Sequence, residues 1–410
     1  MKEFISISIF SLAFTFIILV NHILPINNSF INFKSEEINI EKKIISNENL
    51  TSIIDYHKTN VVFAKRPATT FIIETLSNIC SISKGLSFVL VNFFLFFLCG
   101  LLLYYLTQLV VKEKMYSYTT VGLFYLSFSV FFAFFDSIHT YDEPLQYFLI
   151  LCSLIAIIKQ KWIFFITTFT LSLIARESGL LLIPALFILI NKNDTTYLSK
   201  QNKKSSIYLF IPVLIYICFI AFYTNKYQLS ETSQSDFLNR LDHFNYNFQN
   251  LNFALETFTS LFVAIGLQTY ILIIYFIKNK ADKLETKIIK AYLITLFLNT
   301  LVVLVATKAR ETRLFTLPLF LMWPILGKFL IIEIKHFIEN KRITILIKNK
   351  WFLLIFSLFV LLEILFYKFV YVSTVNAKGG SFQDEYFLII CLLITFHSLI
   401  NLFNTINTKK

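Results

Sequence analysis

The charged residues best suited to chemistry stand in four short segments between apolar runs. These segments are F-A-K-R-P (63–67), T-Y-D-E-P (140–144), A-R-E-S-G (175–179) and A-R-E-T-R (309–313). Arginine suits a phosphate ligand because its planar guanidinium holds two phosphate oxygens at once. A carboxylate nearby can take a proton from a hydroxyl group. The segments therefore indicate chemistry on a ligand that carries a phosphate.

Arg176 and Glu177 are adjacent, and neighbouring helical positions point about 100° apart, so each needs a partner elsewhere. One interpretation has Arg176 on a phosphate with Glu177 orienting it. The other places both residues in salt bridges between helices. Arg310 and Arg313 either form a cationic rim at a cavity mouth or lie in a solvated loop, with Arg313 reaching outward from the start of a helix.

The segment before Pro144 also has two interpretations. Asp142 or Thr140 can cap the helix that begins near Pro144. Alternatively, Asp136, His139, Asp142 and Glu143 are close enough to hold a divalent metal or a water, although a single histidine among carboxylates makes Asp136 and His139 weak metal candidates. No cofactor is clearly indicated.

The composition requires a membrane. The chain is 56% hydrophobic and 15% charged, whereas soluble domains are roughly a quarter charged. At about 20 residues per transmembrane helix, its apolar content fills roughly eleven or twelve helices. No glycine-rich nucleotide motif is present, so no nucleotide site is expected. The net charge of +12 comes from lysines between apolar runs, which indicates membrane topology rather than nucleic-acid binding.

One segment decides the topology. About 30 residues between Lys161 and Lys192 would make a helix of about 45 Å, against a hydrocarbon core of about 30 Å. We predict two short helices with A-R-E-S-G at their tip, because this choice keeps most lysines and arginines on the cytoplasmic side. The prediction is an all-α polytopic protein of about 12 helices, with both termini cytoplasmic. Residues 1–410 form one membrane domain, with outside loops after helices 1 and 7 at 25–87, including an interfacial helix, and at 224–254.

In this order and topology, the segments resemble the multi-spanning bacterial membrane glycosyltransferases of the GT-C fold class. The matching stretches are Phe63–Pro67, Tyr141–Pro144, Ala175–Pro184 and Glu311–Pro318, together with an acidic loop after the first helix. The resemblance implies transfer of a sugar from a polyprenyl-phosphate donor at the outer face of the bacterial cytoplasmic membrane.

The resemblance also implies roles for individual residues. The catalytic base falls on Glu36 or Glu37 of the first outside loop, assisted by Asp142 or Glu143. The donor phosphate is expected near Arg66 and Arg176, with Arg310 and Arg313 as further phosphate ligands and Lys65 and Glu177 as orienting residues. The expected partners are the lipid-linked donor and membrane lipid. A flippase for lipid-linked sugars, a polysaccharide polymerase and a structural scaffold remain alternatives.

Overall fold

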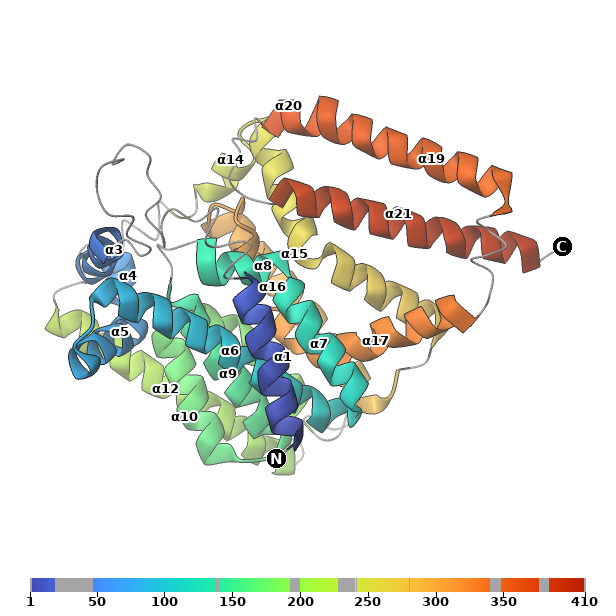
Figure 1. Cartoon of the computed structure of the whole chain (residues 1–410). Coiled ribbons are helices and arrows are strands. Elements are labelled where there is room, and N and C mark those ends of the chain that lie inside the picture. The colour runs from blue at the N-terminus through green and yellow to red at the C-terminus, as the bar shows by residue number, and fades with distance from the viewer. Residues whose placement is uncertain are drawn as a thin grey trace.

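A computed structural model of the chain describes residues 2–18, 47–136, 141–191, 200–227, 240, 242–279, 281–339, 348–375 and 383–408. Every regular element within these ranges is a helix (Figure 1). In chain order they are α1 (Lys2–Ile18), α3 (Asn47–Thr59), α4 (Val61–Ala64), α5 (Pro67–Cys80), α6 (Lys84–Val111), α7 (Lys114–Leu126), α8 (Phe128–Phe131), η3 (Phe132–Asp136), α9 (Glu143–Ile158), α10 (Trp162–Ala175), η5 (Glu177–Leu182), α11 (Ile183–Ile190), α12 (Lys200–Lys226), α14 (His243–Asn247), α15 (Leu251–Lys278), α16 (Lys283–Ala306), η6 (Thr312–Phe315), α17 (Leu319–Glu339), α19 (Lys350–Leu365), η7 (Phe366–Tyr371), α20 (Val372–Val375) and α21 (Gln383–Thr408). Over the part that the structure describes, the chain is all-α, as its composition predicts.

Several helices can cross a membrane. Six candidate spans occur among the described residues: α6, most of α12, α15, α16, the segment Lys350–Thr374 and most of α21. Helices α7 and α8 bend by 57° and add a seventh if they form one span, and four more apolar helices have only 10–17 residues. The chain is therefore a multi-pass membrane protein. The count of about twelve spans stays a prediction, since it depends on the short helices.

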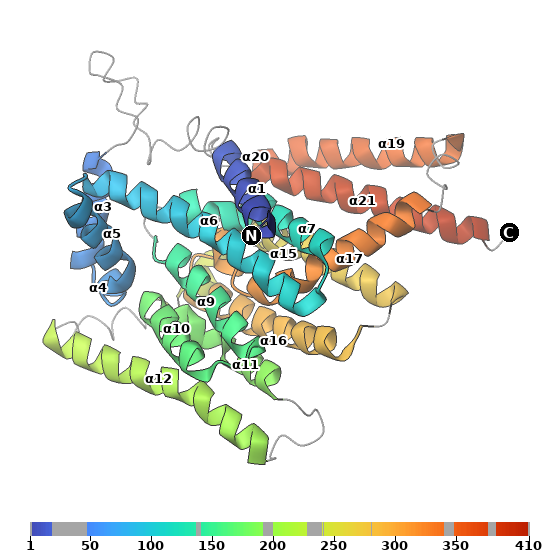
Figure 2. The same cartoon turned by 60° about the horizontal axis from the view of Figure 1, so that its bottom comes forward.

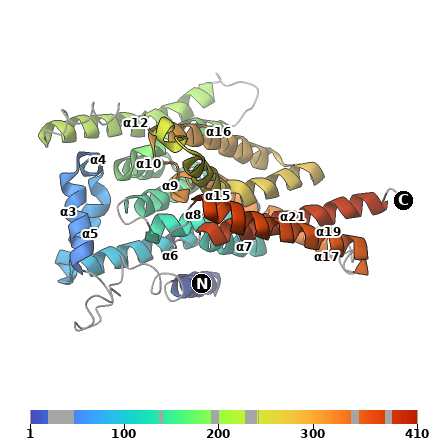
Figure 3. The ribbon, with the colours of Figure 1, turned by 90° about the horizontal axis from the view of Figure 1, so that it is seen from above.

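The helices are arranged around a central group. Helix α6 packs against α7 and α9, and α17 packs against α7 and α6. Helices α19 and α21 lie side by side and extend away from this group (Figures 1 and 2). Helix α12 lies at the opposite edge, and α3, α4 and α5 form a small group at one side (Figure 3).

A glycine permits the closest approach between two central helices. A Cβ atom on Gly327 of α17 would lie 2.8 Å from the backbone nitrogen of Thr120 in α7 and would also collide with the carbonyl oxygen of Tyr116. Thr120 Oγ1 donates a hydrogen bond of 3.2 Å to the carbonyl oxygen of Trp323 across the same contact. Small residues at such crossings let helix backbones pack tightly inside membranes.

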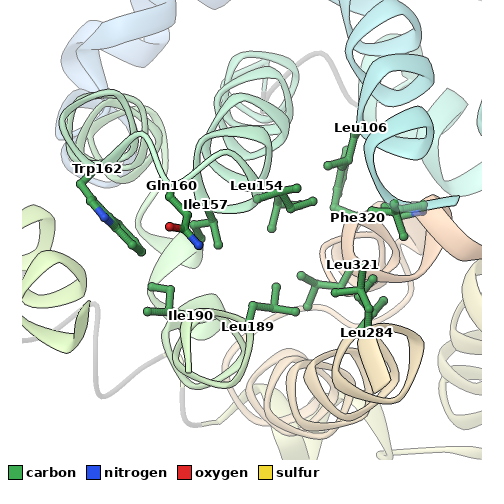
Figure 4. Close-up of a pocket in the computed structure, with 14 residues that line it drawn as sticks. Leu106, Leu154, Ile157, Gln160, Trp162, Leu189, Ile190, Leu284, Phe320 and Leu321 are labelled. Atoms are coloured by element: carbon green, nitrogen blue, oxygen red, sulfur yellow. The ribbon is translucent and has the colours of Figure 1, made fainter. Parts of the chain in front are cut away.

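The segment 162–190 turns back on itself. Helix α10 ends where Arg176 adopts an extended conformation, with φ −162° and ψ 127°, and Pro184 starts α11 near its N-terminus, where proline is favourable. Trp162 at the start of α10 and Ile190 at the end of α11 line the same cavity of about 270 Å³ (Figure 4). The two ends of the segment are thus close together, and Arg176–Gly179 lies at the tip, in the arrangement expected from the length of the segment.

Helices occupy parts of both predicted outside loops. Asn60 caps α4 by accepting a hydrogen bond from the backbone N–H of Val62, and Pro67 begins α5. The predicted interfacial helix corresponds to α5, which leaves Phe71 and Ile79 exposed and buries Thr69 and Thr70. In the second loop, α12 continues to Lys226, α14 follows, and Asn250 caps α15 through Phe253 N–H.

Candidate functional site

Seven charged side chains form one chain of ion pairs in which the sign of the charge alternates. Its order is Glu177, Arg66, Asp142, Arg176, Glu143, Arg313 and Glu311. We call this the ion-pair chain. It contains residues from all four segments that the sequence singled out, and one of its pairs joins residues 170 positions apart.

The ends of several helices bring these residues together. Arg66 directly precedes α5, and Asp142 and Glu143 begin α9. The hairpin tip supplies the pair 176–177, and η6, between α16 and α17, supplies the residues near 312. The ion-pair chain therefore lies where α9 begins and where α10 and α16 end.

Arg66 binds carboxylates on both sides. Its Nη1 donates to Asp142 Oδ2 at 3.0 Å, and its Nε donates to Glu177 Oε2 at 2.7 Å while Nη2 binds the other oxygen of Glu177. Burial by itself lowers the pKa of the Arg66 guanidinium, but the charges of Glu177 and Asp142 more than compensate and raise it above its ordinary value. Arg66 therefore stays charged although its side chain is only 8% exposed.

Arg176 lies between the two adjacent carboxylates at the start of α9. Its Nη1 is 3.5 Å from Asp142 Oδ2 and 2.6 Å from Glu143 Oε1. Asp142 occupies the N-cap position of α9, but its side chain makes no capping hydrogen bond. Capping therefore does not explain Asp142, whose side chain binds arginines instead. Arg176 and Glu177 do find separate partners on other elements, as their adjacency predicts.

Arg313 is the third arginine with carboxylates on two sides. Its Nη1 binds Glu143 and its Nη2 binds Glu311. The carbonyl oxygen of Leu314 accepts a 2.9 Å hydrogen bond from Asn299 in α16, which draws the segment back against the helices. Burial by itself lowers the pKa of Arg313, but Glu143 and Glu311 raise it above its ordinary value. The solvated-loop interpretation is wrong for Arg313, whose side chain is 6% exposed.

Two atoms of the ion-pair chain are buried without a hydrogen-bond partner among the described residues. They are Asp142 Oδ1, an acceptor, and Arg313 Nε, a donor. Buried polar atoms normally have partners, so such exceptions call for an explanation. One hydrogen-bond acceptor and one donor of the ion-pair chain are therefore unused among the described residues.

The two ends of the ion-pair chain are more open than its middle. Glu177 is 38% exposed and Glu311 is 37% exposed, whereas Asp142 and Glu143 are at most 3% exposed. Three arginines against four carboxylates leave one net negative charge. Without the two exposed carboxylates, the buried part carries one net positive charge, which favours an anionic ligand.

Residues on the same face of α9 that sequence reasoning missed support the ion-pair chain. Gln146 Nε2 donates to the carbonyl oxygen of Arg176 at 2.8 Å and its Oε1 accepts from Ser178 Oγ at 3.1 Å, which ties the hairpin tip to α9. Tyr147 OH lies 3.5 Å from Glu143 Oε2. The available signal was their spacing of three and four residues from Glu143, which places them on one helix face. Glu311 was also missed, although it stands two residues before Arg313.

One predicted arginine, Arg310, lies outside the ion-pair chain. Arg310 donates to Glu256 Oε2 at 2.9 Å and to Tyr246 OH at 2.8 Å, with its guanidinium 4.1 Å from the centroid of the Phe253 ring. Lys65 ends α4 beside Arg66 and is partly exposed. The structure therefore places Arg310 in a separate ion pair rather than among the partners of Arg313.

The remaining predicted residues are not described. Glu36, Glu37 and His139 lie outside the described residues, and of Asp136 only the backbone, at the end of η3, is described. Among the described residues, no group of three or more His, Cys, Asp or Glu side chains can hold a metal ion. The predicted base in the first loop and the weaker metal candidates stay predictions.

A second cluster of charges lies near the other end of the helices. Lys278 and His397 both bind Glu333. On α15, Lys278 follows Glu256 by 22 residues, or about 33 Å of helix, which matches the thickness of the hydrocarbon core. The ion-pair chain and this cluster therefore lie at opposite ends of the helices.

An apolar cavity of about 510 Å³ lies between α7, α15, α17 and α21. It begins at Ser127 and Phe128, next to α8, which packs against η6. It extends along α15 from Val263 to Ile274, about 16 Å at the helical rise. Glu333 and His397 lie among its otherwise mainly apolar lining residues. By contrast, none of the residues that line the smaller cavity in Figure 4 is ionisable.

Comparisons with protein families, with curated proteins and with solved structures found no match to this chain.

Proposed function

We propose that the protein is a membrane glycosyltransferase that transfers a sugar from a polyprenyl-phosphate donor to a hydroxyl group of an envelope acceptor. The observation that carries this proposal is the ion-pair chain with its two unpartnered atoms. Asp142 Oδ1 can accept a hydrogen bond from an acceptor hydroxyl, and Arg313 Nε can donate one to a donor phosphate. The reaction needs both a hydrogen-bond acceptor for the attacking hydroxyl and a hydrogen-bond donor for the phosphate.

Asp142 is the carboxylate of α9 best suited to act as the base. Its Oδ2 is held by Arg66 and Arg176, which fixes the direction of the free Oδ1. Glu143 is less suited, because its Oε1 binds two arginines and its Oε2 faces the hydroxyl of Tyr147. Glu36 and Glu37 remain alternative bases.

The proposed reaction is a direct displacement. The acceptor oxygen attacks the anomeric carbon while its proton passes to Asp142 Oδ1. The bond between the anomeric carbon and the phosphate oxygen breaks, and its electron pair leaves with the polyprenyl phosphate. The phosphate gains one negative charge in this step, so arginines already in position stabilise the transition state more than the ground state.

The apolar cavity supports a lipid-linked donor. Phe128, the first residue of α8, lines one end of the cavity, and α8 packs against η6. A hydrocarbon chain in this cavity would therefore start near the segment that carries Arg313. We propose that the site faces the outer side of the cytoplasmic membrane of a bacterium and that both termini are cytoplasmic. This orientation follows the distribution of lysines and arginines.

The test is release of polyprenyl phosphate from a panel of polyprenyl-phosphate hexoses and pentoses, offered to the purified full chain with envelope lipid extracts as acceptors. We expect wild-type turnover and a loss of 10²-fold or more in Asp142→Asn, as is typical when a general base is removed. Asparagine keeps the shape of the side chain and can still accept from the arginines. Glu285→Gln at the start of α16 is the matched control and should keep full turnover, because its carboxylate is similarly buried at 3% exposed, binds Lys328 and lines neither cavity.

Other results would redirect the proposal. Full turnover in Asp142→Asn together with loss in Glu36→Gln or Glu37→Gln would move the base to the first loop. Movement of labelled lipid between leaflets without cleavage of the sugar–phosphate bond would favour a flippase. Full turnover in Asp142→Asn, Arg313→Gln and Arg176→Ala would exclude the ion-pair chain as the active site.

A further inference from the structure

We propose that the phosphate of the donor binds the edge of Arg313 formed by Nε and Nη2, by displacing the carboxylate of Glu311 from Nη2. This inference rests on the proposed function and specifies which contact the ligand replaces. In this proposal Glu311 competes with the ligand for Arg313. If the ion pair were purely structural, Glu311 would only stabilise the fold.

Arg313 is held firmly from its inner side. Its Nη1 binds Glu143, which is 3% exposed and is held in turn by Arg176 at 2.6 Å. Asn299 fixes the backbone of the next residue, Leu314. The guanidinium can therefore keep its place while its outer partner changes.

Glu311 is held loosely by comparison. It binds Arg313 through Nη2 alone, so Arg313 Nε has no partner among the described residues. It occupies the N-cap position of η6, but its side chain makes no capping hydrogen bond. With 37% of its side chain exposed, Glu311 can move into solvent without burying a charge.

A phosphate can form more hydrogen bonds to the Nε–Nη2 edge of Arg313 than Glu311 does. Guanidinium groups hold phosphate oxygens through two parallel N–H donors, so a phosphate would pair both Nε and Nη2. The exchange replaces one hydrogen bond with two and gives the buried Nε its missing acceptor. A phosphodiester donor carries one negative charge, as the carboxylate does, so the net charge of the site is unchanged.

The opposite end of the ion-pair chain lacks this advantage. Glu177 already binds Arg66 through both Nε and Nη2, so exchange for a phosphate there would gain no hydrogen bond. Its exposed fraction of 38% is nearly equal to that of Glu311. Glu177 is therefore a matched control that differs in bonding but not in exposure.

The experiment measures the binding of farnesyl phosphate to the purified full chain in lipid nanodiscs by calorimetry at about pH 5. At this pH the phosphate monoester, with a second pKa of about 6, carries about one negative charge, as the donor does. Farnesol is the probe that lacks the phosphate. We expect Glu311→Gln to bind farnesyl phosphate about tenfold more tightly than wild type, since one charge-assisted hydrogen bond no longer competes. Farnesol binding should not change. Glu177→Gln should show no gain in affinity for farnesyl phosphate.

A second variant guards against misfolding. Glu311→Asp keeps the charge but shortens the side chain, and it should also tighten farnesyl phosphate binding because the carboxylate reaches Arg313 less well. Unchanged or weaker binding in both Glu311 variants, with wild type binding farnesyl phosphate more tightly than farnesol, would overturn the displacement and leave the proposed function intact. Equal affinity of wild type for farnesyl phosphate and farnesol would overturn both.

Discussion

Arg313 and Glu143 lie 170 residues apart in the chain, yet their side chains form an ion pair with exposed fractions of only 6% and 3%. The pair connects the start of α9 to the segment between α16 and α17. Because charges are costly away from water, such a pair remains stable only when each member keeps its partners. It therefore couples the position of the candidate site to the packing of these helices.

Breaking this pair should destabilise the protein strongly. We expect Arg313→Leu and Glu143→Gln each to cost about 3–5 kcal/mol of unfolding free energy, since each leaves a buried charge with fewer partners. The double variant should cost less than the sum of the two. Unfolding in mixed micelles of increasing dodecyl sulfate content, followed by tryptophan fluorescence, measures these differences.

Arg310→Leu is the control for the Arg313 prediction. Arg310 and its partner Glu256 are 23% and 24% exposed, so its loss should cost less than about 2 kcal/mol even with its aromatic contacts. Equal costs at Arg310 and Arg313 would show that burial does not set the strength of these ion pairs.

Gly327 should not tolerate a larger side chain. Gly327→Ala brings a methyl group against the backbone of α7 at Tyr116 and Thr120, and overpacking of this kind costs roughly 1–3 kcal/mol. Gly122→Ala in α7 is the matched control, because a Cβ at Gly122 meets no atom within 4 Å. Its effect should be neutral or stabilising by up to about 1 kcal/mol. Thermal unfolding of both variants in the same detergent distinguishes them. If Gly327→Ala loses no more stability than Gly122→Ala, α17 cannot lie as close to α7 as the Gly327 contact requires.

The acid sensitivity of the hairpin tip should depend on Glu177. Burial raises the pKa of Glu177, but the charge of Arg66 outweighs burial and lowers the pKa from 4.5 to about 2. A lowered pKa stabilises the folded state fully above the pKa of the unfolded state, and this stabilisation is lost as the pH falls toward the folded value. Between pH 4.5 and pH 2, the Tm of wild type should therefore fall more steeply than that of Glu177→Gln. Parallel curves over this range would mean that Glu177 is not coupled to Arg66.

The hairpin at 162–190 can be tested by labelling. Lys308, beside the ion-pair chain, and Lys161, at the far end of α10, are both exposed. Single cysteines at these positions in a cysteine-free background should react with an impermeant maleimide on opposite sides of the membrane, Lys308→Cys in intact cells and Lys161→Cys only after permeabilisation. Labelling of both positions in intact cells would contradict the topology and the proposed outward-facing site.

The all-α fold and the types of residue at the candidate site could be predicted from the sequence. Apolar runs bounded by lysine, asparagine and proline predict helices, because these patterns act within a few residues. The break near Arg176 followed from length alone, since about 30 residues are too many for one straight span. That Arg176 and Glu177 need separate partners followed from the angle between neighbouring side chains.

Which charged residues form ion pairs with one another depends on the packing of the helices. The sequence treated the segment at Arg310 and Arg313 as one group, but the structure pairs Arg310 with Glu256 and buries Arg313 against Glu143. This division depends on Asn299 drawing the segment against α16, a contact with no local pattern. The packing of the helices likewise pairs Asp142 with two arginines, where the sequence also allowed a helix cap. The Arg66–Asp142 pair joins positions separated by 76 residues, and the Glu143–Arg313 pair joins positions separated by 170. Such pairs depend on how the helix ends pack together, which no short stretch of sequence specifies.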